Sequence, residues 1–218
     1  MKFSNSEENY LKAIFQLQLD NGTVTTNVLA EKLNARPASI TDMMKKLSVK
    51  NLVVYKPYYG FHLNNEGKKI ALSIIRRHRL WEYFLSHKLK FGWDEVHVIA
   101  EELEHVSSKK LIDKLDAYLD FPQFDPHGDP IPDSKGKIKS ADRLTLNQLP
   151  INQPARVIRV INQSTEMLEL LQMKNICIGS EIEVKKNFVF DGSLTIKIKP
   201  NKTETISEQL AKNIFVTI

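Results

Sequence analysis

The chain has 218 residues, of which 42% are hydrophobic and 26% charged, so it is expected to fold into one to three globular domains. Its apolar stretches are shorter than the roughly 18 residues of a membrane span, and its polar start is unlike a signal sequence, so we expect a cytoplasmic protein without a membrane partner. The single cysteine, Cys177, excludes an internal disulfide and a thiolate cluster, so a metal site would need nitrogen and oxygen ligands. The net charge of +5 permits nucleic-acid binding without requiring it.

The first 66 residues have the pattern of a winged helix-turn-helix domain. Apolar residues recur at helical spacing from Ser6, a candidate cap, to about residue 20, then from Thr25 to about residue 33, and again from Pro37 to about residue 47. The second and third of these helices are joined by a tight turn. Two strand-like runs, 52–55 and 61–63, flank a loop with Pro and Gly and predict the wing.

The rest of the chain predicts two further domains. Helices over about 66–88, 94–107 and 109–119, followed by a connector rich in Pro and Gly, predict a helical domain over residues 67–139. Residues 143–218 predict a small β-barrel with one helix near 165–173 and strands at 156–161, 180–184, 188–190, 194–198 and 215–216. The expected fold class is therefore mainly α with a small β part.

Two segments place imidazole and carboxylate groups on one helical face. His78 and Glu82 are four residues apart, so they could chelate one ion. A longer stripe on the next helix consists of His97, Glu101, Glu104 and His105. Such faces are metal sites in some proteins and solvated surfaces in others, and spacing alone leaves both interpretations open.

These segments resemble a known family. The stretch 77–82 (RHRLWE), the His and Glu residues of 97–105 and the Pro-rich segment 126–132 (PHGDPIP) resemble the metal-binding region of the diphtheria toxin repressor and manganese transport regulator family. The likeness covers almost the whole chain, and the last domain is similar to the SH3-like, or FeoA-like, domain of three-domain members. Asp125 stands where cysteine is common. The resemblance implies a homodimeric, metal-dependent repressor that binds a palindromic operator in double-stranded DNA and controls metal homeostasis.

The resemblance also implies two sets of metal ligands. The primary set would be Asn9, Glu101, Glu104 and His105, and the ancillary set His78, Glu82, His97 and Glu166, with Gln163 or Glu169 as alternatives to Glu166. Lys12 stands where some manganese-type members have a liganding Glu, and Glu8 is a possible substitute donor. Iron-type members have cysteine at the position of Glu101, and a carboxylate there favours Mn2+, with Fe2+ as the second candidate.

The start of the third helix is expected to read DNA, because the second helix of a helix-turn-helix enters the major groove. Its candidate base-reading residues are Arg36, Pro37, Ser39, Thr41 and Asp42, and its candidate phosphate contacts are Lys45 and Lys46. Lys45 and Lys46 could instead form a solvated face. Lys56, Tyr58 and Tyr59 of the wing are expected to add backbone contacts.

The sequence also bears on dimerisation and on two alternative functions, an enzyme and a metal-independent regulator. Apolar residues of the long helix either form a dimer surface or fill the monomer core: Ile74, Leu80, Trp81, Phe84 and Leu85. No enzyme is expected, since the H-E-x-x-H motif, a nucleophile elbow and a phosphate-binding Gly loop are absent. The remaining alternative is a metal-independent winged-helix regulator that senses a small organic ligand in the barrel.

Overall fold

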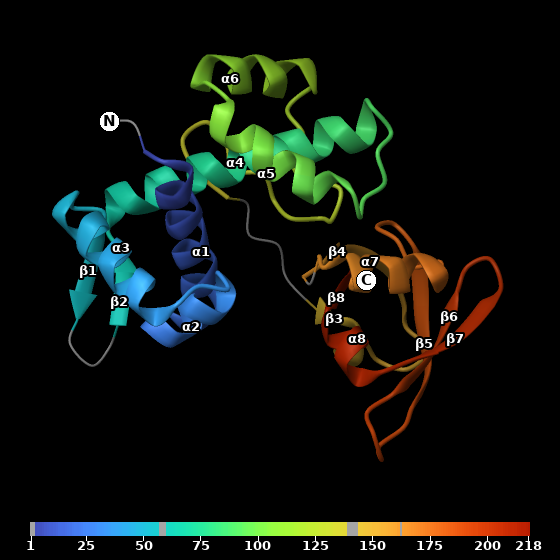
Figure 1. The fold of residues 1–218 in the computed structure, drawn as a ribbon. Coiled ribbons are helices and arrows are strands. Elements are labelled where there is room, and N and C mark those ends of the chain that lie inside the picture. Colours follow the sequence, from blue (N-terminus) through green and yellow to red (C-terminus); the bar gives the residue numbers. More distant parts are fainter. Residues whose placement is uncertain (1–2, 57–59, 139–143, 162) are drawn as a thin grey trace. The chain divides into compact units, whose positions relative to one another are not determined.

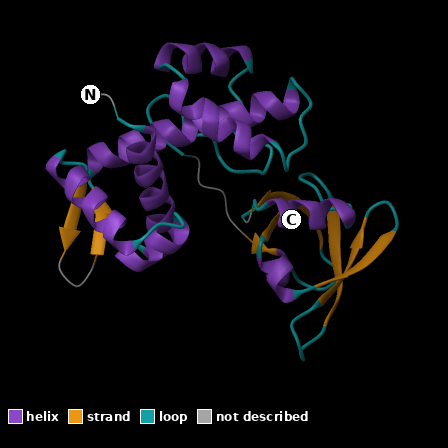
Figure 2. Ribbon diagram, viewed as in Figure 1, coloured by secondary structure: helices purple, strands orange, loops and turns teal. Residues whose placement is uncertain are grey.

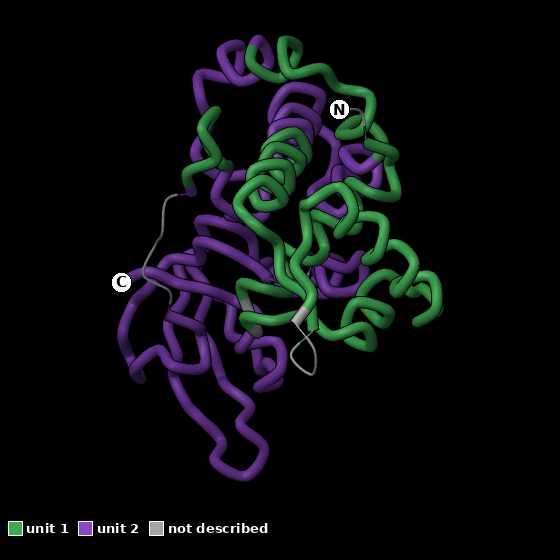
Figure 3. The backbone as a smooth tube through the Cα atoms, turned by 90° about the vertical axis from the view of Figure 1, so that its left-hand side faces the viewer, with its two compact units in different colours: residues 1–78, 102–113, 132–137 green, residues 79–101, 114–131, 138–218 purple. Residues whose placement is uncertain are grey.

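The computed structural model describes residues 3–56, 60–138, 144–161 and 163–218. Its contacts divide the chain into two compact units, shown in Figure 3, and each is described by itself. Unit 1 comprises Met1–His78, Glu102–Asp113 and Pro132–Lys137, and unit 2 comprises Arg79–Glu101, Lys114–Ile131 and Ile138–Ile218. Among the described residues, no helix combines the length and the apolar character that crossing a membrane requires.

Helix α1 (Asn5–Asn21) begins earlier than the sequence suggested. Its N-cap is Ser4, whose hydroxyl accepts a hydrogen bond from the Glu7 N–H, while the Glu7 carboxylate accepts one from the Ser4 N–H. This reciprocal capping box satisfies two amides that the helix leaves free. The prediction of Ser6 as the cap was therefore wrong, and Glu7 acquires a structural role.

The winged helix-turn-helix is confirmed in unit 1, in blue and cyan in Figure 1. It consists of α1, α2 (Thr26–Lys32), α3 (Pro37–Val49) and the antiparallel strands β1 (Val53–Lys56) and β2 (Gly60–Leu63). Ile40, Met44 and Leu47 of α3 are buried in one core with residues of α1. Tyr58 and Tyr59 lie outside the described residues.

Three helices follow: α4 (Asn65–His87), α5 (Val96–Val106) and α6 (Lys109–Tyr118). Ile74, Leu80 and Leu85 of α4 are buried within the single chain, whereas Trp81 and Phe84 are partly exposed. Of the two interpretations that the sequence left open for these three residues, the structure therefore supports the core of the chain and not the dimer surface.

The C-terminal domain is strand-rich, as Figure 2 shows, and lies in unit 2. Its sheet has the order β3-β8-β4-β5-β6-β7, with antiparallel neighbours throughout. Around it are packed α7, α8 and a short 3-10 helix, η1. The elements are β3 (Leu144–Thr145), η1 (Leu146–Gln148), β4 (Pro154–Val160), α7 (Thr165–Met173), β5 (Glu181–Asn187), β6 (Leu194–Ile198), β7 (Lys202–Ile206), α8 (Glu208–Lys212) and β8 (Ile214–Thr217).

This domain differs from the prediction in several elements, since β3, η1, β7 and α8 were not predicted and one predicted strand is a turn. Residues 188–190 form a turn between β5 and β6, in which the Gly192 N–H donates to the Phe188 carbonyl. The run is apolar, but Val189 and Phe190 are almost wholly exposed, so burial does not explain their hydrophobicity. Strand β7 was missed because its sequence, KTETI, is mostly polar.

Candidate metal centre

Five ionisable side chains from α1, α4 and α5 converge in unit 1, and we call them the α1 cluster: Glu8, Lys12, His78, Glu104 and His105. At its centre is the fully buried Glu104 carboxylate. Lys12 Nζ donates a hydrogen bond of 2.7 Å to Glu104 Oε1, and His78 Nδ1 lies 2.7 Å from Glu104 Oε2. Both carboxylate oxygens therefore have a basic neighbour within the protein.

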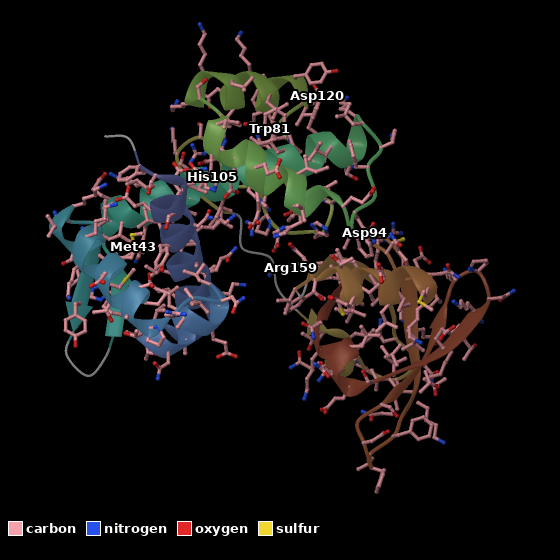
Figure 4. All side chains as sticks on the ribbon, in the orientation of Figure 1. Met43, Trp81, Asp94, His105, Asp120 and Arg159 are labelled. Atoms are coloured by element: carbon pink, nitrogen blue, oxygen red, sulfur yellow. The ribbon has the colours of Figure 1, made fainter. Side chains whose placement is uncertain are left out.

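The second carboxylate of the α1 cluster is Glu8, which shares a face of α1 with Lys12 because the two are four residues apart. Glu8 Oε2 lies 2.7 Å from His105 Nδ1, and Glu8 Oε1 accepts a hydrogen bond of 2.8 Å from Arg77 Nη2. Figure 4 labels His105 beside α1. Two carboxylates are thus matched by the two cations Lys12 and Arg77, and this ion-pair network ties α1 to α4 and α5.

The pKa of Glu104 reflects this arrangement. Burial alone would raise the pKa, but the hydrogen bond and charge of His78, together with the charge and hydrogen bond of Lys12, lower it below its ordinary value. Glu104 is therefore held ionised by cationic neighbours that the chain itself supplies.

Asn9 and Glu101, the other predicted primary ligands, lie in different surroundings. Asn9 Oδ1 is buried and has no hydrogen-bond partner within the described parts of the chain, so it is an available oxygen donor. The Glu101 side chain is 50% exposed and lies 3.7 Å from His97 Nε2. The structure therefore places Glu101 with His97 and leaves Glu104 and His105 with α1.

The predicted ancillary residues of α4 and α5 do come together. His78 and Glu82 are one turn apart on α4, and one ligand atom from each of His78, Glu82 and His97 lies within 4.8 Å of the others. His97 Nδ1 is 3.1 Å from Glu82 Oε1. Glu166 belongs to no such group: it is exposed, and bonds to its own backbone amide and to Ser164 at the start of α7 lower its pKa.

A second group was missed by the sequence argument. Glu82, Asp125 and His127, all buried, also offer ligand atoms within 4.8 Å of one another, and we call them the connector cluster because the Pro-rich connector supplies two of them. His127 belongs to the quoted Pro-rich segment and Asp125 directly precedes it, but the sequence does not show that this segment returns to Glu82. Glu82 is a member of both groups.

His127 is held in the tautomer that a metal ligand requires. Its Nε2 is 2.7 Å from the Trp93 carbonyl oxygen, which can only accept, so Nε2 carries the proton. The lone pair of the neutral ring is then on Nδ1, which is buried and has no hydrogen-bond partner among the described residues. A carbonyl that fixes the ring in this way is typical of histidines that bind metals.

Asp125 combines a structural oxygen with an available one. Oδ1 accepts hydrogen bonds of 2.9 Å from the amides of His127 and Asp129, which shapes the loop. Oδ2 is buried and accepts no hydrogen bond within the described ranges, although Arg79 Nε lies 3.5 Å away. Burial and the charges of Glu82 and Asp129 raise the pKa of Asp125 well above its ordinary value, against the opposing charge of Arg79.

The connector cluster therefore fits a divalent cation. It offers imidazole nitrogen and carboxylate oxygen, and both Asp125 Oδ2 and His127 Nδ1 are buried without a hydrogen-bond partner among the described residues. The α1 cluster contains similar donors, but there the Lys12 ammonium already pairs with Glu104 and His78 lies against its second carboxylate oxygen.

The C-terminal domain holds the connector in place within unit 2. The Val160 N–H of β4 donates to the His127 carbonyl, Arg159 forms an ion pair with Asp129, and Gln163 Nε2 donates to Asp129 Oδ2 at 2.8 Å. Arg159 is labelled in Figure 4. Gln163, an alternative to Glu166, thus supports the loop that carries His127.

The predicted DNA-reading residues lie on the outer face of α3. Arg36, Pro37, Ser39, Thr41, Asp42, Lys45 and Lys46 are all exposed. Lys45 Nζ is 3.4 Å from Asp42 Oδ1, and Lys46 Nζ is 3.1 Å from Glu7 Oε1. Lys45 would therefore lose only a weak, exposed ion pair on binding a phosphate, whereas Lys46 would also lose its ion pair with Glu7 of α1.

Models of known protein families match three segments of the chain. Residues 2–61 match the N-terminal DNA-binding domain of iron-dependent repressors, and residues 64–133 match the metal-binding and dimerisation domain of the same repressors. Residues 144–218 match the FeoA domain.

Individual relatives are similar over most of their lengths. The chain is 25% identical to the iron-dependent repressor IdeR of Mycobacterium tuberculosis, over 97% of this chain and 96% of that protein. It is 30% identical to the transcriptional regulator MntR of Oceanobacillus iheyensis, over 63% of this chain and 92% of that protein. A solved manganese-dependent transcriptional repressor in complex with manganese is 32% identical, with a TM-score of 0.88 and coverage of 97% of this chain and 99% of that one.

Proposed function

The chain belongs to the diphtheria toxin repressor family of metal-dependent transcriptional regulators, and we propose that it represses transcription by binding operator DNA in response to Mn2+. The observation that carries the metal response is the buried convergence of Glu82, Asp125 and His127, with His78 and His97 beside Glu82. Its donors are nitrogen and oxygen.

The donor set favours Mn2+ over softer metal ions. The described residues include one cysteine, Cys177, which is exposed and outside both groups, so thiolate does not contribute. Fe2+ is the second candidate, since the relatives include an iron-dependent repressor. Zn2+ can bind such a site more tightly than Mn2+, so affinity alone does not identify the physiological ion.

Regulation would act through the position of α1. One face of α1 packs in the core of the DNA-binding domain through Leu11 and Ile14, and its Glu8–Lys12 face bonds to α4 and α5. Setting the angle of α1 therefore sets the recognition helix α3. When bound, the ion would supply the positive charge that the carboxylates lack and so stabilise one arrangement of α4, from which Glu82 projects.

We propose that Arg36, Pro37, Ser39, Thr41 and Asp42 meet base edges, and that Lys45 and Lys46 contact phosphates. We also propose a homodimer on a palindromic operator, because a dimer presents two recognition helices to successive major grooves. Exposed apolar side chains on α5 and α6 are candidates for its interface: Val98, Val106, Leu111 and Tyr118. Sedimentation of a monomer at micromolar concentration would count against the dimer.

The direct test selects the operator from a pool of DNA duplexes with a random core of about 30 base pairs. This length accommodates two half-sites whose centres lie about 34 Å, or one helical turn, apart. Fluorescence anisotropy then measures the affinity of the selected duplex with Mn2+, Fe2+, Zn2+ or Co2+ under anaerobic conditions, and with a chelator. We expect Mn2+ to tighten binding about a hundredfold, which corresponds to about 2.7 kcal/mol of coupling.

Three variants locate the response. Glu82→Gln and His127→Gln remove one ligand each and should abolish the stimulation by Mn2+. His87→Gln is the matched control, because His87 lies on the same helix as Glu82 but outside both ligand groups. Full stimulation of both ligand variants would refute the site, and equal DNA affinity with Mn2+ and with chelator would refute metal control.

A further inference from the structure

Lys12 is a buried cation at a place where the family resemblance leads one to expect a metal. Its side chain comes from the α1 face that meets α5, and only 8% of the residue is exposed. Its ammonium donates a 2.7 Å hydrogen bond to Oε1 of Glu104, which is fully buried. A buried carboxylate must be matched by a cation or be protonated, because water cannot solvate it.

A divalent ion at Glu104 would compete with this ammonium. Asn9, on the same helix as Lys12, has a buried Oδ1 without a hydrogen-bond partner among the described residues, and such an oxygen is a ligand that a divalent ion accepts. An ion coordinated by Glu104 Oε1, however, would lie next to Lys12 Nζ, because both would contact the same oxygen atom. Two positive charges this close together repel strongly inside a protein, where water does not screen them. Binding of Lys12 and binding of the ion to Glu104 Oε1 therefore weaken each other.

We propose that Lys12 is an internal competitor for the cation at Glu104. Its ammonium ties α1 to α5 in the metal-free protein, and it must leave before a divalent ion binds there. The connector cluster differs, because Asp125 Oδ2 and His127 Nδ1 are without a hydrogen bond among the described residues, and the cation beside Asp125 Oδ2, Arg79, is 3.5 Å away and not at 2.7 Å as Lys12 is from Glu104. The chain should therefore take its first ion at the connector cluster and bind an ion at the α1 cluster more weakly. This inference rests on the proposed metal binding.

The test counts bound Mn2+ by electron paramagnetic resonance, which detects the free aqueous ion, in titrations of the full-length chain. Lys12→Met removes the charge, and Lys12→Gln keeps an amide donor for Glu104 in case the Met variant unfolds. Both should bind the second Mn2+ at least tenfold more tightly than the wild type. Thermal unfolding should show more stabilisation by Mn2+ in these variants than in the wild type, since the ion replaces the lost charge.

Two further variants make the result specific. Adding Glu104→Gln to Lys12→Met should remove the gained affinity. Lys50→Met is the matched control, because Lys50 also pairs with a buried carboxylate of α1, with its Nζ 2.6 Å from Glu7 Oε1, but lies outside the α1 cluster. It should bind Mn2+ like the wild type.

The outcomes separate this inference from the proposed function. If the wild type binds Mn2+ and the Lys12 variants have the same isotherm, the competitor is refuted and the metal response stands. A gain that persists in the Glu104→Gln double variant also refutes it. A gain in the Lys12 variants without Mn2+ binding by the wild type supports the competition at Glu104 but refutes both the first binding at the connector cluster and the Mn2+ response.

Discussion

Glu7 shows how one buried carboxylate can join the DNA-binding helices. Its carboxylate accepts the Ser4 amide, and Glu7 Oε1 lies 2.6 Å from Lys50 Nζ and 3.1 Å from Lys46 Nζ. Burial would raise its pKa, but the hydrogen bond of Lys50, then those of Ser4 and Lys46, lower the pKa from 4.5 to about 2. One side chain thus caps α1 and holds the end of α3.

This lowered pKa predicts a loss of stability in acid. Because the folded state holds the Glu7 proton less tightly than the unfolded state does, the contribution is complete above about pH 4.5 and is lost as the pH falls towards 2. At neutral pH it amounts to at most about 3.5 kcal/mol, since the pKa falls by about 2.5 units and each unit is about 1.4 kcal/mol. Glu7→Gln should lower the free energy of unfolding at pH 7 and flatten its decline between pH 4.5 and 2.

Urea unfolding at a series of pH values measures both effects. Glu31→Gln, at an exposed position of α2, serves as the control and should unfold at neutral pH like the wild type. Parallel pH profiles for the wild type and Glu7→Gln would show that the ion pairs of Glu7 contribute nothing.

Single residues also mark the limit of prediction from the sequence. Helical spacing placed His78 and Glu82 on one face, because four-residue steps on α4 fix the direction of side chains, whereas His97 of α5 was added to them only through the family resemblance. Helical spacing had no means to place Asp125 and His127 beside Glu82, because a Pro-rich loop has no periodicity and its path depends on tertiary contacts. The pairing of Lys12 with Glu104 is equally long-range.

Among the elements, the connector depends on a close backbone approach. Gly128 has φ +85°, and a Cβ there would lie 1.9 Å from the Ile158 carbonyl oxygen of β4. Gly179 has a similar φ of +90°, but nothing lies within 4 Å of its Cβ position. The two glycines therefore share the backbone strain that Ala would suffer and differ in the steric clash.

Comparing Gly128→Ala with Gly179→Ala isolates that clash. Gly179→Ala should cost about 1 to 2 kcal/mol of unfolding free energy, the usual penalty of a positive φ. Gly128→Ala should cost at least about 2 kcal/mol more and should weaken Mn2+ binding, because the displaced loop carries His127. Thermal and urea unfolding measure the first effect, and Mn2+ titration the second. Equal costs for the two variants would contradict the close packing of connector and β4.

Helix α3 supports a prediction about salt dependence. Lys45 is exposed and its pair with Asp42 is weak, so it is available to a phosphate. Each phosphate contact contributes about 0.9 to the slope of log affinity against log salt, so Lys45→Ala should reduce that slope by about 2 in a dimer.

Anisotropy titrations at several salt concentrations with saturating Mn2+ measure the slope. Lys50→Ala is the control, because Glu7 holds Lys50, and it should leave the slope unchanged. An unaltered slope for Lys45→Ala would remove Lys45 from the DNA interface.

The elements were predictable where a period was strong. The helices and the first hairpin have clear 3.6- and 2-residue patterns, and their bounds agree with the structure within a few residues. Residues 188–190 were misread because apolar side chains at a hairpin tip look like a strand. In β7 and α8 no apolar pattern of useful length exists, and pairing with β6 decides the structure of β7.

At the scale of the whole molecule, metal and DNA binding should form one linked equilibrium. The residues proposed to bind the ion lie on α4, α5 and the connector, whereas the DNA-reading residues lie on α3, so neither ligand needs to touch the other. If Mn2+ tightens DNA binding by a given factor, DNA must tighten Mn2+ binding by the same factor, taken as the product over all the ions bound.

This reciprocity can be measured directly. Mn2+ titrations followed by electron paramagnetic resonance are made with and without saturating selected duplex. The changes in Mn2+ affinity, multiplied over all the ions bound, should equal the hundredfold change expected of DNA affinity, and a duplex of scrambled sequence should produce a much smaller change. In His127→Gln both factors should fall together, because one conformational equilibrium transmits them. If Mn2+ changes DNA affinity strongly but DNA does not change Mn2+ affinity, Mn2+ acts through another equilibrium, such as assembly of the dimer. That result would refute regulation by a single two-state conformational equilibrium.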